Sequence, residues 1–137
     1  MSQSVQATLA PVRNSNEMEG VIAALSRESD GGLIVLPSAP ITANIGAIIE
    51  SAALHRVPTV YPFGSHARQG GLVAYGVELN DLFRRAAVYV DRILKGDKPA
   101  DLRLQAPTKY DFLIKTAKEL GLTIPATLLA RADEVIE

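Results

Sequence analysis

The sequence GGLVAYG at residues 70–76 is followed closely by LNDLFRRAA at residues 79–87. The first part is a short apolar run ending in a Tyr-Gly pair, which predicts a strand over 72–75 and then a turn. The second part opens a long helix with one wide apolar stripe: Leu79, Leu82, Phe83, Ala86, Ala87, Val90, Ile93 and Leu94. Gly96 is a typical left-handed stop for this helix. A strand that leads into an amphipathic helix is the building unit of α/β proteins.

Three further strands are predicted upstream of this unit. Residues 4–12 alternate moderately between apolar and polar side chains. Leu33–Leu36 is apolar at every position, which is typical of a strand buried on both faces of a parallel sheet. Residues 58–61 form a third short run before Pro62.

Helices separate these strands. Asn14 and Glu17 stand at capping-box spacing ahead of a helix that ends near Asp30-Gly31-Gly32. A second helix begins after Thr42 or Asn44, and a short helix or turn covers residues 63–69. Alternating strands and helices with short connections predict an α/β fold: an open, doubly wound parallel sheet flanked by helices.

The last third of the chain is less regular. Residues 102–104 and 110–114 are predicted to be extended, and residues 116–120 to form at least one helical turn. Pro125 is predicted to take the first position of a terminal helix that runs to Val135.

Composition limits the possible functions. The 137 residues are enough for one α/β domain, 1–137, and 47% of them are apolar, so a folded core is expected. A net charge of −1 provides no field for nucleic acid. Cysteine is absent, which excludes disulfides and thiolate metal sites. The sequence contains no run of about 18 apolar residues, so no membrane span is predicted. Residues 1–4 show no signal-peptide pattern.

The motifs of common enzymes are missing. There is no glycine-rich dinucleotide or nucleotide loop and no nucleophile elbow. His55 and His66 are too far apart in the sequence to suggest a metal pair, although His66 lies on a predicted rim loop and could contact a ligand. We therefore predict no catalytic residue, no metal, no cofactor and no enzymatic activity.

A binding site is expected where the parallel strands end. Ligands of open α/β sheets lie outside the carboxyl ends of the strands, which here means the loops at 37–44, 62–68 and 75–80. The first loop is either an anion cradle at a helix start or a plain connection. Tyr75 either contacts a ligand or is a half-buried core tyrosine, and Phe63 has the same two alternatives. Gly76 is expected to need a positive φ angle or close ligand approach.

The ordered set of motifs resembles a known family. LVAYG at residues 72–76, the KGDKP stop at 95–99, QAPTK at 105–109 and LGLTIP at 120–125 occur in this order. The set is similar to the C-terminal part of bacterial ABC-transporter solute-binding proteins, in the branch of tryptophan/tyrosine-binding lipoproteins. The resemblance implies the second, Rossmann-like lobe of a type I periplasmic binding protein, with the first lobe absent. Carried over by position, it implies ligand contacts at Pro37, Ser38, Ala39, Phe63, Tyr75, Gly76 and Asn80.

The same resemblance implies a function. The expected role is non-covalent capture of a small solute, an amino acid in known cases of this branch, for delivery to an ABC permease. The family implies a periplasmic or membrane-anchored extracytoplasmic location. Because an isolated lobe exposes the surface that packs on its partner, a homodimer is also expected. The alternative function is a free-standing sensory or effector module, similar to the ligand-binding lobes of transcription regulators.

Overall fold

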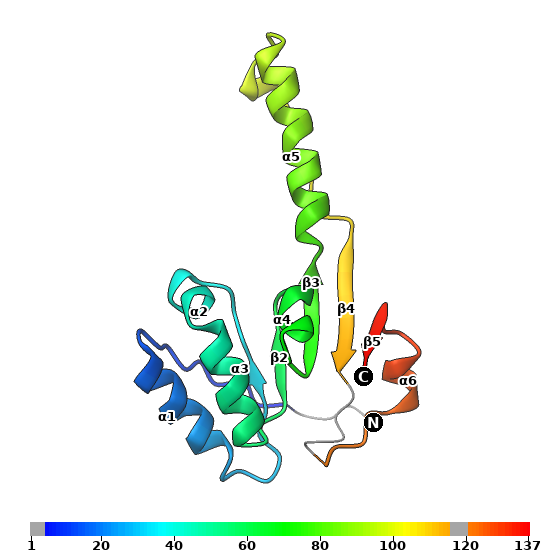
Figure 1. Cartoon of the computed structure of the whole chain (residues 1–137). Coiled ribbons are helices and arrows are strands. Elements are labelled where there is room, and N and C mark those ends of the chain that lie inside the picture. The colour runs from blue at the N-terminus through cyan, green and yellow to red at the C-terminus, as the bar shows by residue number, and fades with distance from the viewer. Residues whose placement is uncertain (1–4, 116–120) are drawn as a thin grey trace.

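The computed structural model describes residues 5–115 and 121–137, and Figure 1 shows it as a strand-and-helix body from which one helix projects. Its helices are α1 (Ser15–Leu25), α2 (Ala39–Ala43), α3 (Ile45–Leu54), α4 (Gly64–Arg68), α5 (Leu79–Leu94), the 3₁₀ turn η1 (Pro99–Asp101) and α6 (Ala126–Leu129). Its strands are β1 (Leu33–Ile34), β2 (Thr59–Tyr61), β3 (Val73–Val77), β4 (Tyr110–Lys115) and β5 (Glu134–Ile136).

The strands form one open sheet in the order β1-β2-β3-β4-β5. The pairs β1–β2, β2–β3 and β4–β5 are parallel, which confirms the predicted open α/β sheet with helices. One pairing departs from the all-parallel prediction, because β4 runs antiparallel to β3. The reason is the direction of α5: this helix leaves the sheet, and the chain returns to the edge that it left, so β4 runs back along β3.

The core lies on one face of the sheet. The register places Tyr61 beside Ala74 and Ala74 beside Leu113, and Val35, directly after β1, continues this row. All four side chains are buried and belong to one cluster with residues of α1, α3 and α4. The amphipathic helices therefore cover this face.

The opposite face carries exposed apolar side chains. Ile34 is 71% exposed and Leu36 62% exposed, so the prediction that Leu33–Leu36 is buried on both faces is wrong. Further along the same face, Tyr75 and Tyr110 are exposed and Phe112 is half-buried, whereas Ile114 is buried. We call the surface formed by Ile34, Leu36, Tyr75, Tyr110 and Phe112 the open face.

The helix α5 forms as predicted but does not pack on the sheet. Glu78 caps it by accepting hydrogen bonds from the N–H groups of Asn80 and Asp81, and Gly96 ends it with φ of +109°. None of its sixteen residues is buried, and Figure 1 shows it projecting from the body. Residues 102–109 return beside it, because the Tyr89 hydroxyl donates to the Arg103 carbonyl. The helix and this returning segment together form an arm.

Other predicted elements differ at both ends of the chain. Asn14 and Glu17 form the expected cap of α1, but residues 5–12 form no strand. A strand requires a neighbour for its backbone groups, and these residues pair with none of the described strands. Residues 102–104 also form no strand, and the helix predicted at 116–120 lies outside the described residues.

The predicted terminal helix is interrupted. Only Ala126–Leu129 is helical, with Pro125 at the N-cap position, and the chain then joins the sheet as β5. The Asp133 N–H donates to the Phe112 carbonyl, and the Asp133 carboxylate accepts from the Phe112 N–H. These two bonds place the end of the chain against β4 and override its helical pattern.

Candidate functional site

The predicted site residues follow the ends of β1, β2 and β3. These three strands are parallel, so their carboxyl ends lie at the same edge of the sheet. Pro37 and Ser38 lie exposed on the connection from β1 to α2, and the exposed Ala39 is the first residue of α2. The edge therefore has the composition that the sequence predicted, and its use as a ligand site stays a prediction.

The loop after β1 has limited capacity for an anion. Ser38 is the N-cap residue of α2, but its side chain accepts no capping hydrogen bond. The helix has five residues, and Pro40 within its first turn has no N–H to donate. The Asn44 side chain donates to the Pro40 carbonyl and is engaged in the turn itself. The loop therefore offers an anion the Ser38 hydroxyl, with little contribution from the N-terminus of α2.

Gly76 is required by the backbone next to it. A Cβ atom at Gly76 would lie 1.8 Å from the Pro62 carbonyl oxygen, closer than any real contact. Its φ is not positive, which removes the first of the two alternatives, and close ligand approach stays a prediction. The glycine lets the connection from β2 to α4 cross close to β3, which fixes the backbone of Phe63 beside that strand.

The aromatic residues of the site form two separate groups. The Tyr75 ring stacks on Tyr110 with centroids 6.2 Å apart and meets the edge of Phe112 at 6.0 Å. The Phe63 ring instead meets His66 at 5.4 Å. Tyr75 is 59% exposed, which removes the core-tyrosine alternative. The structure does not bring the rings of Tyr75 and Phe63 into one cluster.

Two residues of this region were not identified from the sequence. Tyr110 and Phe112 lie opposite Val77 and Tyr75 on β4 and share their face. The alternation Tyr110-Asp111-Phe112 indicated that both aromatic rings lie on one face of a strand. The antiparallel partner that places them beside Tyr75 had no local signal.

His66 is buried instead of lying on a solvent-exposed rim. Its side chain packs edge-on against Tyr61 and Phe63. Only 6% of the residue is exposed, and its Nδ1 atom is buried without a hydrogen-bond partner among the described residues. Burial lowers the pKa of His66 below its ordinary value, because a desolvated imidazolium is unfavourable. In the same cluster, burial raises the pKa of Tyr61 to about 12.

This histidine should make stability depend on pH. The unfolded chain takes up a proton near pH 6.5, whereas the folded chain holds the neutral ring to lower pH. The free energy of unfolding should therefore fall as pH drops below about 6.5, by at most about 1.4 kcal/mol per pH unit, and level off below the folded-state pKa. Urea titrations of the wild type, His66→Phe and His55→Gln between pH 7.5 and 5 measure this dependence of the free energy of unfolding on pH. The slope should disappear in His66→Phe and persist in His55→Gln, and a slope retained in His66→Phe would contradict this assignment.

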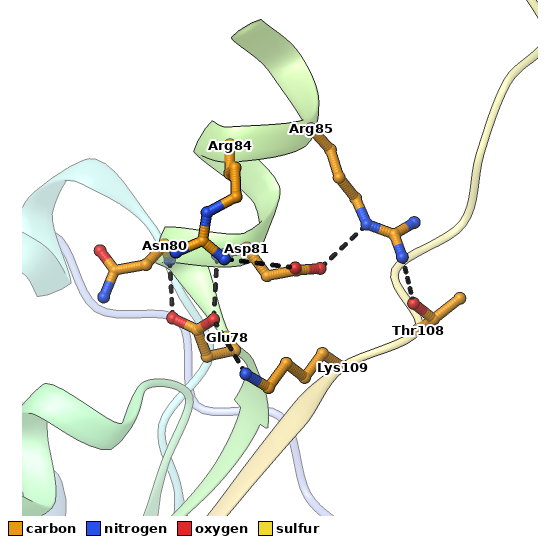
Figure 2. A network of polar contacts seen from close by, with 7 residues as sticks. All are labelled: Glu78, Asn80, Asp81, Arg84, Arg85, Thr108 and Lys109. Atoms are coloured by element: carbon orange, nitrogen blue, oxygen red, sulfur yellow. Dashed lines mark hydrogen bonds and ion pairs between the residues drawn. The ribbon is translucent and has the colours of Figure 1, made fainter. Parts of the chain in front are cut away.

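A polar network fixes the base of the arm (Figure 2). The Glu78 N–H donates to the Lys109 carbonyl. The Lys109 Nζ atom also lies 3.8 Å from the Glu78 Oε2 atom. Asp81 pairs with Arg85 at 2.9 Å, and Arg85 in turn donates to Thr108. These contacts bind the start of α5 to the segment that enters β4.

Asn80 lies at the rim of this network. Its N–H donates to Glu78 at 2.9 Å, and its side chain is exposed and points away from the other labelled side chains in Figure 2. The amide of Asn80 is thus presented to solvent at the carboxyl edge of the sheet.

The described residues provide few other functional groups. Within 5–115 and 121–137, no three His, Asp or Glu side chains gather closely enough to hold a metal ion. Of the helices in these ranges, none has both the length and the apolar character needed to cross a bilayer.

Residues 3–136 match the model of a family described as ABC transporter substrate binding protein. No match was found among curated proteins. Similar solved structures include three bacterial proteins. A conserved domain protein from Vibrio cholerae is 25% identical with a TM-score of 0.77, over 89% of this chain and 42% of its own. An ABC domain from Streptococcus pneumoniae, solved in complex with L-Trp, is also 25% identical with a TM-score of 0.77, over 91% of this chain and 44% of its own.

The third structure is the ligand-free, open form of a substrate binding protein with adhesive properties from Clostridium difficile. It is 17% identical with a TM-score of 0.59, over 91% of this chain and 42% of its own, and supports the fold alone. The chain thus spans less than half the length of each of these proteins. The shared part corresponds to one lobe.

Proposed function

We propose that this chain, which belongs to the family of ABC transporter substrate binding proteins, supplies one wall of a site that captures a small solute for uptake. The observation that carries the proposal is the family match over residues 3–136, together with the position of the candidate residues at one edge of the sheet. The second wall comes from a facing lobe, and the solute passes to a membrane permease on the extracytoplasmic side.

An aromatic amino acid fits this edge best. The edge combines exposed aromatic surface at Tyr75 with small polar groups at Ser38 and Asn80. A mostly apolar surface with few polar groups is typical of small-molecule sites. The similar pneumococcal domain was solved with L-Trp, which supports this solute class for the present chain.

The proposal is tested by adding solutes to the whole chain. Thermal unfolding and titration calorimetry with L-tryptophan, then with the other amino acids, should show a stabilising ligand. If no amino acid shifts the midpoint or releases heat, the proposed solute class is wrong.

Replacing Asn80 should then weaken the solute. A hydrogen bond to a charged ligand group is worth roughly 1.5–3 kcal/mol, so Asn80→Ala should lower affinity for the stabilising amino acid about tenfold or more. Asn16→Ala is the matched control, because Asn16 is also exposed at the second position of a capped helix. Calorimetry on both variants measures the effect. Equal affinities would show that Asn80 makes no contact with the solute.

A further inference from the structure

His66 lies in an aromatic cluster behind the carboxyl edge of the sheet. Its ring meets the Tyr61 ring edge-on, with centroids 6.0 Å apart, and meets the Phe63 ring at 5.4 Å. Tyr61 is the last residue of β2 and is 1% exposed. Phe63 is half-buried and is the N-cap residue of α4. The histidine therefore connects a core side chain to one of the candidate ligand contacts.

The cluster accommodates the His66 ring without an acceptor for a proton on Nδ1. The Nδ1 atom is buried and has no hydrogen-bond partner among the described residues. The chain closes tightly behind the rings, since a Cβ atom at Gly71 would lie 2.7 Å from the Tyr61 ring and 2.9 Å from the His66 carbonyl oxygen. A proton on Nδ1 would thus create a buried, charged donor without an acceptor, which is costly. Because this chain itself encloses the atom, a facing lobe does not reach it while α4 stays in place.

The charged groups around α4 do not offset this cost. The helix packs on β2, β3 and β4. The titratable and charged side chains on these elements and on the ends of α4 are Tyr61 on β2, Asp111 and Lys115 on the face of β4 that carries Leu113, and Arg68, which pairs with Glu134 of β5 at 2.7 Å. The Asp111 Oδ2 atom lies at the start of α4, 3.2 Å from a Cβ position at Gly64. Among the described residues, neither carboxylate forms an ion pair with His66.

The helix α4 is short enough to open separately from the rest of the domain. It has five residues and is followed by Gly70, with φ of +116°, and Gly71. The N–H groups of Gln69, Gly70 and Gly71 donate to carbonyls of the helix. Short segments near an edge open at a lower free energy than the whole domain. These three amides therefore report the opening of α4.

We propose that His66 is a pH-dependent switch that positions Phe63 at the solute edge. The neutral ring holds Phe63 and α4 against the sheet. The protonated ring leaves the cluster for water, so Phe63 loses its neighbour, α4 opens, and a solute captured at neutral pH is released. The opening of α4 stands by itself, whereas the release of the solute rests on the proposed function.

Hydrogen exchange on the free chain tests the opening. The equilibrium constant for opening, measured at the amides of Gln69, Gly70 and Gly71, should rise by up to about tenfold per pH unit as the pH falls from about 6.5 to 5. It should be independent of pH in His66→Phe and follow the wild type in His55→Gln. The proposal is overturned if these amides exchange only with global unfolding, as measured in urea, at every pH. A pH dependence that persists in His66→Phe would also overturn it.

Titration calorimetry with L-tryptophan tests the release of the solute. The apparent dissociation constant equals the intrinsic constant divided by the fraction of molecules in the closed form. From pH 7.5 to 5 it should therefore rise about threefold or more in the wild type and in His55→Gln, and by less than about twofold in His66→Phe. A purely structural role of His66 would instead make the dissociation constant of His66→Phe differ by the same factor at each pH.

The two measurements separate this inference from the proposed function. If no amino acid binds at any pH, the proposed function fails, and hydrogen exchange still decides whether His66 controls α4. If L-tryptophan binds the wild type with the same affinity at pH 7.5 and 5, the proposed function stands and His66 is not a switch of the solute edge.

Discussion

Replacing Gly76 with alanine should cost the protein at least about 3 kcal/mol of its free energy of unfolding. The added methyl group would lie 1.8 Å from the Pro62 carbonyl oxygen and 2.9 Å from its carbon. Both atoms belong to the backbone, so no side-chain rotation relieves the clash. The connection from β2 to α4 must move, and α4 packs on β2, β3 and β4.

Gly20 is the matched control for this substitution. It lies inside α1, and a Cβ atom there meets nothing within 4 Å. Gly20→Ala should raise stability by up to about 1 kcal/mol, because alanine favours the helix. Urea unfolding followed by far-UV circular dichroism measures both variants. If Gly76→Ala is as stable as the wild type, Pro62 does not approach β3 as described.

Truncating Leu113 should have the second largest effect, a loss of about 3 kcal/mol within the 2–5 kcal/mol range of buried leucines. Leu113 is 1% exposed and lies opposite Ala74 on the covered face of the sheet. Its side chain also contacts the start of α4, where its Cδ1 atom lies 3.2 Å from a Cβ position at Gly64. The cavity in Leu113→Ala would therefore separate β4 from the helix above it.

Leu104→Ala is the control for this loss. Leu104 lies on the returning segment of the arm and is fully exposed, so its truncation should change stability by less than about 0.5 kcal/mol. The same urea titration compares the two leucines. Comparable losses would mean that the covered face is not the core of this domain.

The sequence predicted the elements that are held by local signals. The cap formed by Asn14 and Glu17, the parallel strands β1 to β3 and the ends of α5 all follow from residues within a few positions. The one-sided core and the projecting arm could not be predicted. An apolar stripe indicates that a helix packs on something, but it does not indicate on which surface.

In the candidate site too, some residues could be placed from local signals and others could not. Pro37, Ser38 and Phe63 were placed correctly at the carboxyl edge, because the ends of parallel strands share an edge. Tyr110 and Phe112 could not be placed beside Tyr75, since their pairing depends on the direction in which the chain returns from α5. The approach of the Pro62 carbonyl to Gly76 could not be predicted for a similar reason, because this carbonyl lies fourteen residues earlier in the chain.

The attachment of the arm has a mechanical consequence. Its two chain crossings lie side by side at Glu78 and Lys109 and are joined by a hydrogen bond, so they form a single narrow pivot. A sixteen-residue helix is about 24 Å long, so a rotation of about 10° at this pivot carries its far end through about 4 Å. The arm therefore acts as a lever: a small rotation beside Asn80 becomes a larger displacement of any surface bound at the tip of the helix.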